Sequence, residues 1–594
     1  MTGKKIRIGG ASAFYGDSQL AARQLVDKGG VDYLVFDYLA EVTMAILARA
    51  HVRDPQLGYA VDFVTVAMRD VLADCAKKGI KVIANAGGVN VPGCIAALQT
   101  LADAQGLSLT IAGVYGDDLS GRTAELSASG LPDMDSGKPL PDSLSSLNAY
   151  LGAKPIADAL AVGADVVVTG RVVDSAVVLG PLIHEFGWSM TDYDRLAQGS
   201  LAGHVLECGA QCTGGNFTDW HLVPDYSDIS YPVAEVSAGG EFVVEIPPGT
   251  GGMVTRGTVG EQILYEIGDP ANYLLPDVAC DFTSVTLSDI GKDRIQVSGA
   301  RGRAPGPHYK VCATYIDGYR LMGSYFIAGP RAEDKARTGA DAWIKRVRKA
   351  FKARGIADFR EVSIEIIGTE SVYGPNARDF ETREVMCKFG LHHDDKRALA
   401  FASAELAYLG TSGTPGMSGL GGGRVRPQPL MRIHSGLMDK SSVLVKVQVG
   451  NDVITETTYD VGETSELAVC PELLAVMLPA ADAWVEVPLE KLAYARSGDK
   501  GNKANIGLMA REPRFLSIIE SQVTAEAVAT YFAHAMSGTV TRFALPGFGA
   551  YNFLLTEALG GGATASVRMD TQGKAYGQML LSLPVKVPAD WKLA

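Results

Sequence analysis

One short segment of this sequence places a carboxylate beside glycine-rich backbone. Residues 204–220, HVLECGAQCTGGNFTDW, contain Glu207, a candidate catalytic carboxylate, and Thr213, a candidate substrate-binding residue, together with Gly209, Gly214 and Gly215. A carboxylate next to exposed backbone N–H groups can act as a general base beside an oxyanion-binding set of amides. The alternative is a helix end with a buried glutamate that is hydrogen-bonded to backbone. The sequence leaves both interpretations open.

A second segment, residues 169–181 (TGRVVDSAVVLGP), places Arg171 and Asp174 just after an expected strand. In a ligand site, Arg171 would bind substrate and Asp174 would act as a catalytic carboxylate. In a purely structural role, Asp174 would cap the following helix and Arg171 would pair with a neighbouring carboxylate. We predict that Glu207 and Asp174 face one cavity.

A third segment, residues 492–509 (LAYARSGDKGNKANIGLM), predicts a strand, a loop over residues 496–502 and a second strand. Three cations, a hydroxyl group and glycine-exposed amides in such a loop can hold an anion, with Asp499 fixing the loop. The hypothesis is that the loop packs against the main domain and that Arg496 and Lys500 contact a carboxylate or phosphate of the substrate. The alternative is a solvated turn with an Asp–Lys pair.

The first 230 residues supply the elements that would position these groups. Apolar runs alternate with amphipathic helical patterns, which indicates a mainly parallel sheet covered on both faces. Ligands of such sheets bind beyond the carboxyl ends of the strands. Asp37 and Asn85 follow two of these runs and are candidate substrate-binding residues, and Asp17, in the turn after the first run, is a third candidate catalytic carboxylate.

Two further domains are expected after residue 230. Residues 231–480 read as a mixed α/β domain with several strand-like runs and two helical stretches. Residues 488–594 have the length and element order of a small α+β domain of the ferredoxin-like type. The overall class is therefore α/β, with a smaller α+β domain at the C-terminal end.

The glycine-dense segment at residues 410–429, GTSGTPGMSGLGGGRVRPQP, carries Arg424. Long loops inside compact domains are often functional, so a lid or an anion-contacting loop is one interpretation, with Arg424 as a substrate contact. A surface loop without such a role is the other interpretation.

Composition narrows the class of partner. The net charge of −13 argues against nucleic acid and against anionic membranes, because both bind excess Lys and Arg. No apolar run reaches the roughly 18 residues of a membrane span, and no signal peptide is expected. The eight cysteines are scattered without zinc-site spacing, which predicts reduced thiols, no metal and a cytoplasmic protein. Large enzymes commonly form closed oligomers, so a homo-oligomer is also expected.

Several long motifs resemble one family. They are GGASAFYGDS, FDYLAEVTMAIL, ANAGGVNVPG, GVYGDD, GADVVVTGRVVDSA, GHVLECGAQCTGGNFTDW and GTGGMVT, with ARSGDKGNKANIGL in the tail. The chain is similar to the acyclic terpene utilisation (AtuA-type) family, in which a ferredoxin-like domain follows the main domain. The resemblance implies catabolism of branched acids handled as CoA thioesters.

The implied reaction is hydration, dehydration or carbon–carbon cleavage of an acyl-CoA or related carboxylic acid, as in a lyase or hydratase. Such chemistry requires an oxyanion-stabilising group and a carboxylate or histidine base. No cofactor is expected beyond the CoA of the substrate. Two alternatives remain: a non-catalytic ligand-binding or assembly subunit, and a hydrolase or aldolase acting on another hydroxy acid.

Overall fold

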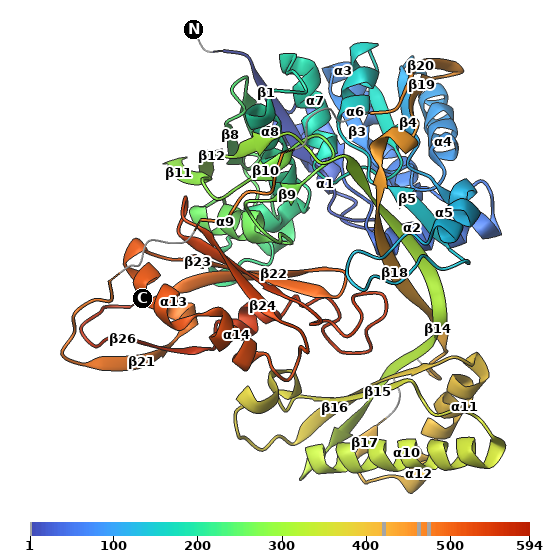
Figure 1. Ribbon diagram of the computed structural model, residues 1–594, viewed down its shortest axis with the longest axis vertical. Coiled ribbons are helices and arrows are strands. Elements are labelled where there is room, and N and C mark those ends of the chain that lie inside the picture. Colours follow the sequence, from blue (N-terminus) through green and yellow to red (C-terminus); the bar gives the residue numbers. More distant parts are fainter. Residues whose placement is uncertain (1–2, 419–422, 460–464, 472–476, 594) are drawn as a thin grey trace.

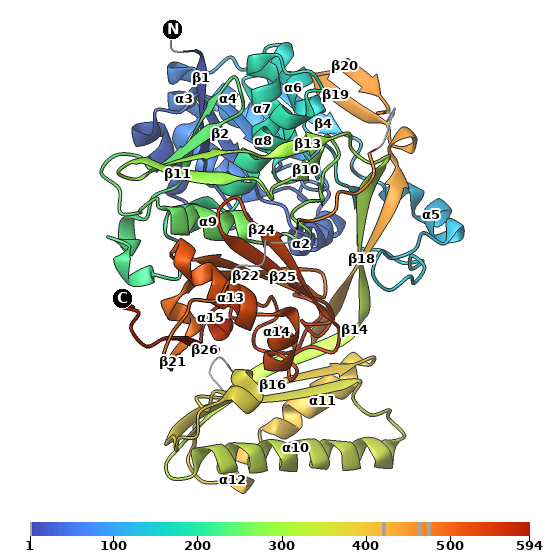
Figure 2. The same ribbon diagram turned by 60° about the vertical axis from the view of Figure 1, so that its left-hand side comes forward.

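The structure is a computed structural model that describes residues 3–418, 423–459, 465–471 and 477–593. A large α/β domain lies at the top of Figure 1, a C-terminal domain lies below it, and an arm extends to the bottom. The same three parts are separated in Figure 2.

The centre of the α/β domain is a parallel sheet. Its five central strands pair in parallel in the order β1-β2-β3-β6-β4, and nearly all their residues are buried, as the apolar runs predict. Antiparallel strands extend both edges to eleven strands. The strands are β1 (Lys5–Gly10), β2 (Tyr33–Phe36), β3 (Lys81–Ala84), β6 (Val166–Thr169) and β4 (Ile111–Tyr115), flanked by β7 (Val233–Ser237), β8 (Phe242–Glu245), β12 (Arg294–Ser298) and β11 (Thr286–Gly291) on one side and by β19 (Val445–Val449) and β20 (Asp452–Thr457) on the other.

Helices cover both faces of this sheet and form two separate apolar cores. One core contains residues of α1 (Ala21–Gln24), η1 (Leu25–Gly29), α2 (Glu41–Arg53), η2 (Phe63–Met68), α3 (Arg69–Lys78) and α4 (Val91–Ala104). The other contains residues of α5 (Thr123–Ser129), α6 (Lys154–Ala161), α7 (Ala176–Phe186), α8 (Tyr193–Leu206) and α9 (Arg256–Leu264). A small sheet of β9 (Tyr273–Leu274), β10 (Ala279–Asp281) and β13 (Arg301–Arg303) adds to this second side.

The arm is built on one long strand. β14 (His308–Ala328) pairs with β5 (Ser146–Ala149) and β18 (Gln428–Asp439) at its first half and with β16 (Glu384–His393) at its second half. The register with β18 shifts between Ile316 and Tyr319, where the strand leaves the main domain. β15 (Glu361–Ile367), β17 (Met417–Ser418), α10 (Ala332–Arg354), α11 (Lys396–Leu406) and α12 (Leu409–Ser412) complete the arm, and Figure 1 shows α10 at its outer face.

The C-terminal domain is the small α+β unit that the sequence predicts. Its sheet has the order β22-β23-β25-β24, and apolar residues of its helices share one core with the strands. The elements are β22 (Ala493–Lys500), β23 (Lys503–Ala510), α13 (Leu516–Gln522), α14 (Ala525–Tyr531), β24 (Val540–Leu545), β25 (Ala550–Leu555) and α15 (Tyr576–Leu580), with β21 (Trp484–Pro488) and β26 (Pro584–Pro588) paired beside them.

The predicted loop at residues 496–502 is mostly strand, so this detail of the prediction is wrong. β22 and β23 pair continuously up to Lys500 and Lys503, and only Gly501 and Asn502 form the turn. Gly501 has φ +63°, which favours glycine. Charged residues fit within this hairpin because their side chains reach the main domain instead of a second apolar layer.

The segment predicted as one middle domain is divided in the structure. β7, β8, β12 and β11 extend the first sheet at one edge, and β19 and β20 extend it at the other. Between them, residues 308–439 form the long ribbon and the arm. The strand content of the segment is as expected, but local sequence does not show which sheet each strand joins.

Candidate active site

Asp37 and Asn85 form a buried pair where β2 and β3 end. The Asn85 Nδ2 atom donates to Asp37 Oδ1 at 2.5 Å, and the backbone N–H of Tyr38 donates to Asn85 Oδ1 at 2.7 Å. Because β2 and β3 are parallel neighbours, the residues that follow them meet at one edge of the sheet. Asn85 therefore fixes both the carboxylate of Asp37 and the backbone that carries it.

Arg171 and Asp174 follow β6 at the same edge. The Arg171 Nη1 atom donates to Asp174 Oδ1 at 2.6 Å and to the carbonyl of Val172 at 3.0 Å. The guanidinium lies 4.1 Å from the ring centroid of Tyr150, and its Nε has no hydrogen-bond partner among the described residues. Arg171 thus pairs with a carboxylate, whereas the predicted cap is absent from this helix end: α7 has no side-chain hydrogen bond at its first turn.

Glu207 ends α8 and pairs with His204 one turn earlier. His204 Nδ1 lies 3.0 Å from Glu207 Oε1, and His204 Nε2 lies 3.2 Å from the carbonyl of Ile263. A carbonyl only accepts, so Nε2 carries a proton and the Nδ1–Oε1 contact holds one further proton. Glu207 Oε2 is buried without a partner among the described residues. Glu207 is therefore bonded to a histidine, not to backbone as the structural alternative expects.

The carboxylates of this region influence one another. Burial raises the pKa of Asp37 well above its usual range, and the charges of Asp174 and Glu207 add to that effect while Arg171 and Asn85 oppose it. Burial also raises the pKa of Glu207, against the opposing charge of His204. Burial alone would lower the pKa of His204, but Glu207 and the carbonyl of Ile263 outweigh it and raise that pKa. Asp37 and Glu207 can therefore be protonated where ordinary carboxyl groups are ionised.

Lys500 reaches this region from the tip of the β22–β23 hairpin. Its Nζ donates to Glu266 Oε2 at 2.8 Å, and 51% of its side-chain surface stays accessible. Burial opposes its charge, yet Glu266, Asp174 and Glu41 outweigh that effect and raise its pKa well above the usual value. Lys500 therefore keeps accessible surface while it lies close to the charges of Asp174 and Glu41. We call Asp37, Asn85, Arg171, Asp174, Glu207 and Lys500 the strand-end site.

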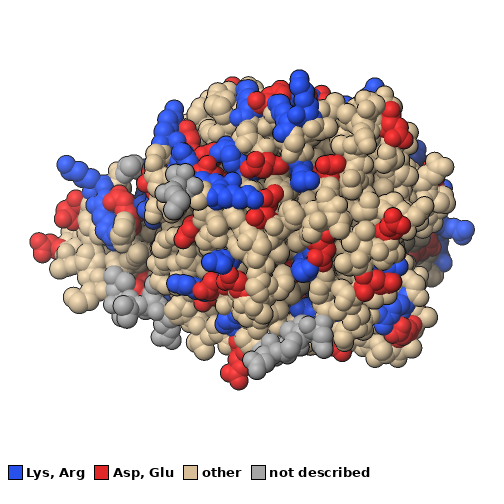
Figure 3. Space-filling model, turned by 90° about the horizontal axis from the view of Figure 1, so that it is seen from above, with Lys and Arg blue, Asp and Glu red and all other residues tan. Residues whose placement is uncertain are grey.

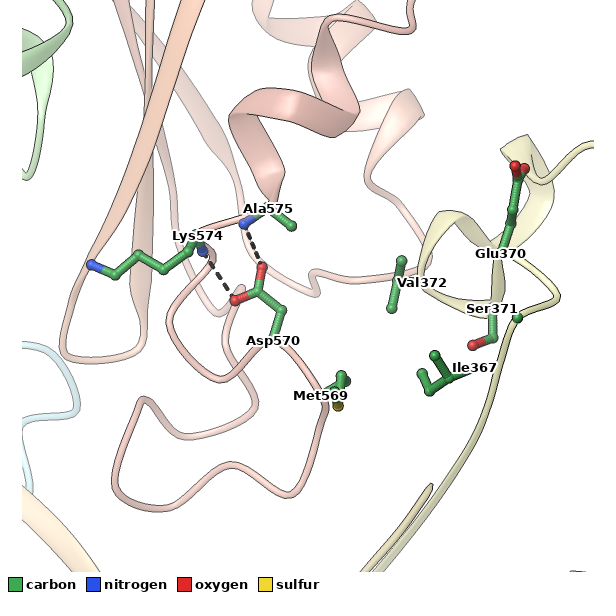
Figure 4. Close-up of a pocket in the computed structure, with 9 residues that line it drawn as sticks. Ile367, Glu370, Ser371, Val372, Met569, Asp570, Lys574 and Ala575 are labelled. Atoms are coloured by element: carbon green, nitrogen blue, oxygen red, sulfur yellow. Dashed lines mark hydrogen bonds between the residues drawn. The ribbon is translucent and has the colours of Figure 1, made fainter. Parts of the chain in front are cut away.

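Lys574 supports Lys500 from the other side of Glu266. Its Nζ lies 3.2 Å from Glu266 Oε1 and 3.1 Å from Asp499 Oδ1, and it also contacts the Tyr265 hydroxyl. Figure 4 shows the turn that carries Lys574, held by hydrogen bonds from the backbone of Lys574 and Ala575 to Asp570. The Lys574 side chain points away from the hollow between this turn and the arm. It therefore belongs to the strand-end side of the domain.

Glu41, Tyr150, Lys310 and Tyr273 also lie near the site and were not predicted. Tyr150 donates to Glu41 Oε1 at 2.8 Å, and Lys310 Nζ lies 3.4 Å from the same oxygen. Burial opposes the ionisation of Glu41, but Lys310, Lys500 and Arg171 outweigh it and lower its pKa. Tyr273 packs on His204 with ring centroids 5.6 Å apart. Glu41 follows the same strand as Asp37 and was within reach of sequence reasoning, but Lys310 and Tyr273 come from distant strands that give no local signal.

Four predicted site residues lie outside the strand-end site. Thr213 is fully buried and donates to the carbonyls of Ala210 and Ser230, so its role is structural. Arg424 is exposed on the arm. Asp17 accepts from the backbone N–H of Ala13 at 2.9 Å and lies in a separate cavity.

Arg496 is the fourth, and its guanidinium binds groups of the main domain outside the strand-end site. Its guanidinium donates to the carbonyl of Asn216 at 2.7 Å and to Gln211 Oε1, and it lies 5.0 Å from the Tyr265 ring centroid. These partners belong to the main domain, so Arg496 joins the two domains. The predicted contact of this hairpin with the main domain is present, but Lys500 alone extends to the strand-end site.

Metal ions, membranes and nucleic acid are three further classes of partner that the described residues can be checked for. Within the described ranges no group of three or more His, Cys, Asp or Glu side chains has metal-binding geometry. No helix in those ranges is long and apolar enough to cross a membrane. The face in Figure 3 shows Lys and Arg interspersed with Asp and Glu, without the broad basic stripe that binds nucleic acid.

The fold and site define an α/β protein whose polar groups gather beyond the parallel strands and face a lysine from a second domain. Residues 6–449 match the acyclic terpene utilisation family protein AtuA, and residues 487–586 match the AtuA ferredoxin-like domain. The chain therefore belongs to the AtuA family of acyclic terpene utilisation proteins, and its C-terminal domain is ferredoxin-like. Comparisons with curated proteins and with solved structures found no significant match.

Proposed function

We propose that this chain is an enzyme of acyclic terpenoid breakdown that acts on a branched acyl-CoA or related carboxylic acid by lyase or hydratase chemistry. The observation that carries the proposal is the His204–Glu207 pair, which leaves Glu207 Oε2 without a partner among the described residues and near the cations of the strand-end site. Family membership supplies the metabolic setting.

Glu207 is the proposed general base and acid. Its Oε1 shares a proton with His204, and Oε2 is the atom left to take a proton from substrate or return it. The raised pKa of Glu207, caused first by burial, brings its proton affinity closer to that of a neutral-pH catalyst. His204 keeps its tautomer because the Ile263 carbonyl holds the Nε2 proton.

The cations are the proposed oxyanion-stabilising groups. Proton removal beside a carbonyl, addition of water to a double bond and carbon–carbon cleavage all build negative charge on the carbonyl oxygen. Lys500 has accessible surface and only part of its donor capacity is used by Glu266, and Arg171 has an unpartnered Nε. Asp37, whose pKa is raised by burial, is a second group that can hold a proton at the same edge.

The test is to incubate the protein with branched, unsaturated and hydroxylated acyl-CoAs and to follow mass changes. We expect turnover of at least one member, and we expect Glu207→Gln to reduce it by about 10²–10⁴-fold with folding retained. Glu261→Gln is the matched control, because Glu261 is also a buried glutamate with an unpartnered Oε2, and burial raises its pKa to about 7. Binding without turnover across the panel would contradict the proposal and favour a ligand-binding subunit.

The proposal also covers the oligomeric state, the cellular location and the cofactor requirement of the protein. We propose a cytoplasmic homo-oligomer that needs no cofactor beyond the CoA of its substrate, since large enzymes commonly associate with closed symmetry. Light scattering is expected to show particles larger than the 62.7 kDa chain. Particles of the single-chain mass would contradict the oligomer without bearing on the chemistry.

A further inference from the structure

A cavity of about 340 Å³ lies beside the strand-end site, between the turn after β1 and the helix η2. This volume is within the range of small-molecule pockets. We call it the β1–η2 cavity, and it is lined by Ser12, Tyr15, Gly16, Asp17, Ser18, Gln19, Tyr38, Asp62, Val66 and Ala67. Seven of these ten residues carry hydroxyl, amide or carboxylate groups, while apolar atoms make up most of the exposed lining, so the cavity suits a chain that is partly apolar and partly polar.

Tyr38 is the best-ordered donor of the cavity. Only 4% of the residue is accessible, its ring packs against Phe36 and Phe63 at centroid distances of 5.8 and 6.0 Å, and Asn85 holds its backbone N–H. Its hydroxyl group makes no hydrogen bond to any described residue and is not one of the fully buried polar atoms, so it stays accessible from the cavity. The fixed ring therefore presents an unused hydroxyl to the cavity.

Two carboxylates supply acceptors on the same walls. Asp62 Oδ2 accepts from the backbone N–H of Gly16 at 3.1 Å, and Asp17 Oδ1 accepts from the Tyr231 hydroxyl at 3.1 Å. These bonds fix both side chains and leave lone pairs for a ligand. Carboxylates repel phosphate, whereas amide N–H and hydroxyl groups donate to them, so an uncharged chain with amides and hydroxyls fits these walls.

The cavity and the strand-end site share a wall. Tyr38 directly follows Asp37, and the Ser12 hydroxyl donates to the Asp37 carbonyl at 3.1 Å. Gly209, two residues after Glu207, faces the Asp17 side chain, since a Cβ built there lies 3.6 Å from Asp17 Oδ2. The cavity and the strand-end site are therefore adjacent.

We propose that the β1–η2 cavity binds the pantetheine arm of a CoA thioester, an uncharged chain of two amides and a hydroxyl group. This inference rests on the proposed function, because the thioester end of that chain would lie at the strand-end site. The Tyr38 and Tyr15 hydroxyls donate to the amide carbonyls, and Asp17 and Asp62 accept from the amide N–H groups. The phosphates and the nucleotide of CoA lie outside the cavity.

The test measures binding of free pantetheine, which lacks phosphate and nucleotide, by calorimetry on the full chain. Tyr38→Phe is expected to weaken binding roughly three- to tenfold, the value of one hydrogen bond. Val66→Trp, which fills the cavity from its partly buried wall, is expected to abolish binding. Tyr59→Phe is the matched control, because Tyr59 is another largely buried tyrosine of the same apolar core that does not line the cavity.

Two results would overturn the inference. One is the absence of pantetheine binding to the wild-type chain, or equal binding in wild type, Tyr38→Phe and Val66→Trp. The other is pantetheine binding that CoA does not compete with, which would assign the cavity to a separate amide or polyol ligand. Because these measurements need no turnover, they are independent of the Glu207→Gln result, and either proposal can fail while the other stands.

Discussion

The base and the tip of the β22–β23 hairpin carry cations with different surroundings. At the base, Arg496 is 8% accessible and binds carbonyl and amide oxygens of the main domain. At the tip, Lys500 has one carboxylate partner and keeps half of its side-chain surface accessible. The same strand therefore holds one cation whose bonds join two domains and another that has donors left for a ligand. Residue type alone does not distinguish them, whereas the number of protein partners does.

The largest effect on folding is expected for Arg496→Met. This change keeps the apolar stem, leaves the carbonyls of Gly215 and Asn216 without their donor, and removes the cation above Tyr265. Buried acceptors left without a donor reduce stability, so we expect the free energy of unfolding to fall by about 2–4 kcal/mol. A thermal scan measures this as a lower melting temperature. An unchanged melting temperature would mean that the base of the hairpin does not join the domains.

The next effect concerns pH and the buried Asp117 beneath the site. Its Oδ2 accepts from the backbone N–H of Arg171 at 2.7 Å and from Asn148 at 3.0 Å, and burial raises its pKa to about 7. A carboxyl group whose pKa is raised by folding stabilises the fold below its ordinary pKa of about 4, and this stability is lost as pH rises through about 7. Asp117→Asn should therefore reduce the fall in stability between pH 4 and 7.

Melting temperatures of wild type and Asp117→Asn at several pH values give this measurement. Asp142→Asn is the matched control, because Asp142 is an exposed aspartate elsewhere in the same domain. Asp117→Asn keeps the part of the pH dependence of stability that comes from Glu261, because burial also raises the pKa of Glu261 to about 7. Parallel pH profiles for all three proteins would show that folding does not raise the pKa of Asp117, and would contradict this prediction.

The smallest effect is expected for Arg424→Ala. The residue is exposed on the arm, so its loss should change stability by less than about 0.5 kcal/mol. Affinity for acyl-CoA should also be unchanged, in contrast to variants at the hairpin tip. Weaker binding by Arg424→Ala would show that the arm contributes to the ligand site.

Sequence reasoning predicts most of the strand-end site but not its surroundings. Asp37, Asn85 and Arg171 could be found because each follows an apolar strand of a parallel sheet, and such strand ends meet at one edge. Lys310 and Tyr273 could not, because they contact Tyr150 and His204 from strands whose position depends on long-range pairing. The His204–Glu207 pair has helical spacing, but its function depends on the Ile263 carbonyl, which is remote in sequence.

The limits of the fold prediction have the same cause. The parallel core and the C-terminal domain follow from local patterns, since each buries runs of neighbouring residues. The sequence predicts a loop at residues 496–502 because polar and glycine residues interrupt the apolar runs on either side. Gly498 and Gly507 explain the difference: a Cβ at Gly498 would lie 2.6 Å from Glu266, and one at Gly507 would lie 2.2 Å from Leu264. The strands lie against the main domain, and tertiary contact decides their structure.

The central claim is that Lys500 completes a ligand site whose other groups lie on the main domain. The most direct measurement compares wild type and Lys500→Met for affinity toward isovaleryl-CoA and for melting temperature. We expect affinity to fall by about tenfold or more, the value of a hydrogen bond to a charged group, while the melting temperature stays unchanged. Unchanged affinity together with a lower melting temperature would contradict the claim and make Lys500 a structural cation like Arg496.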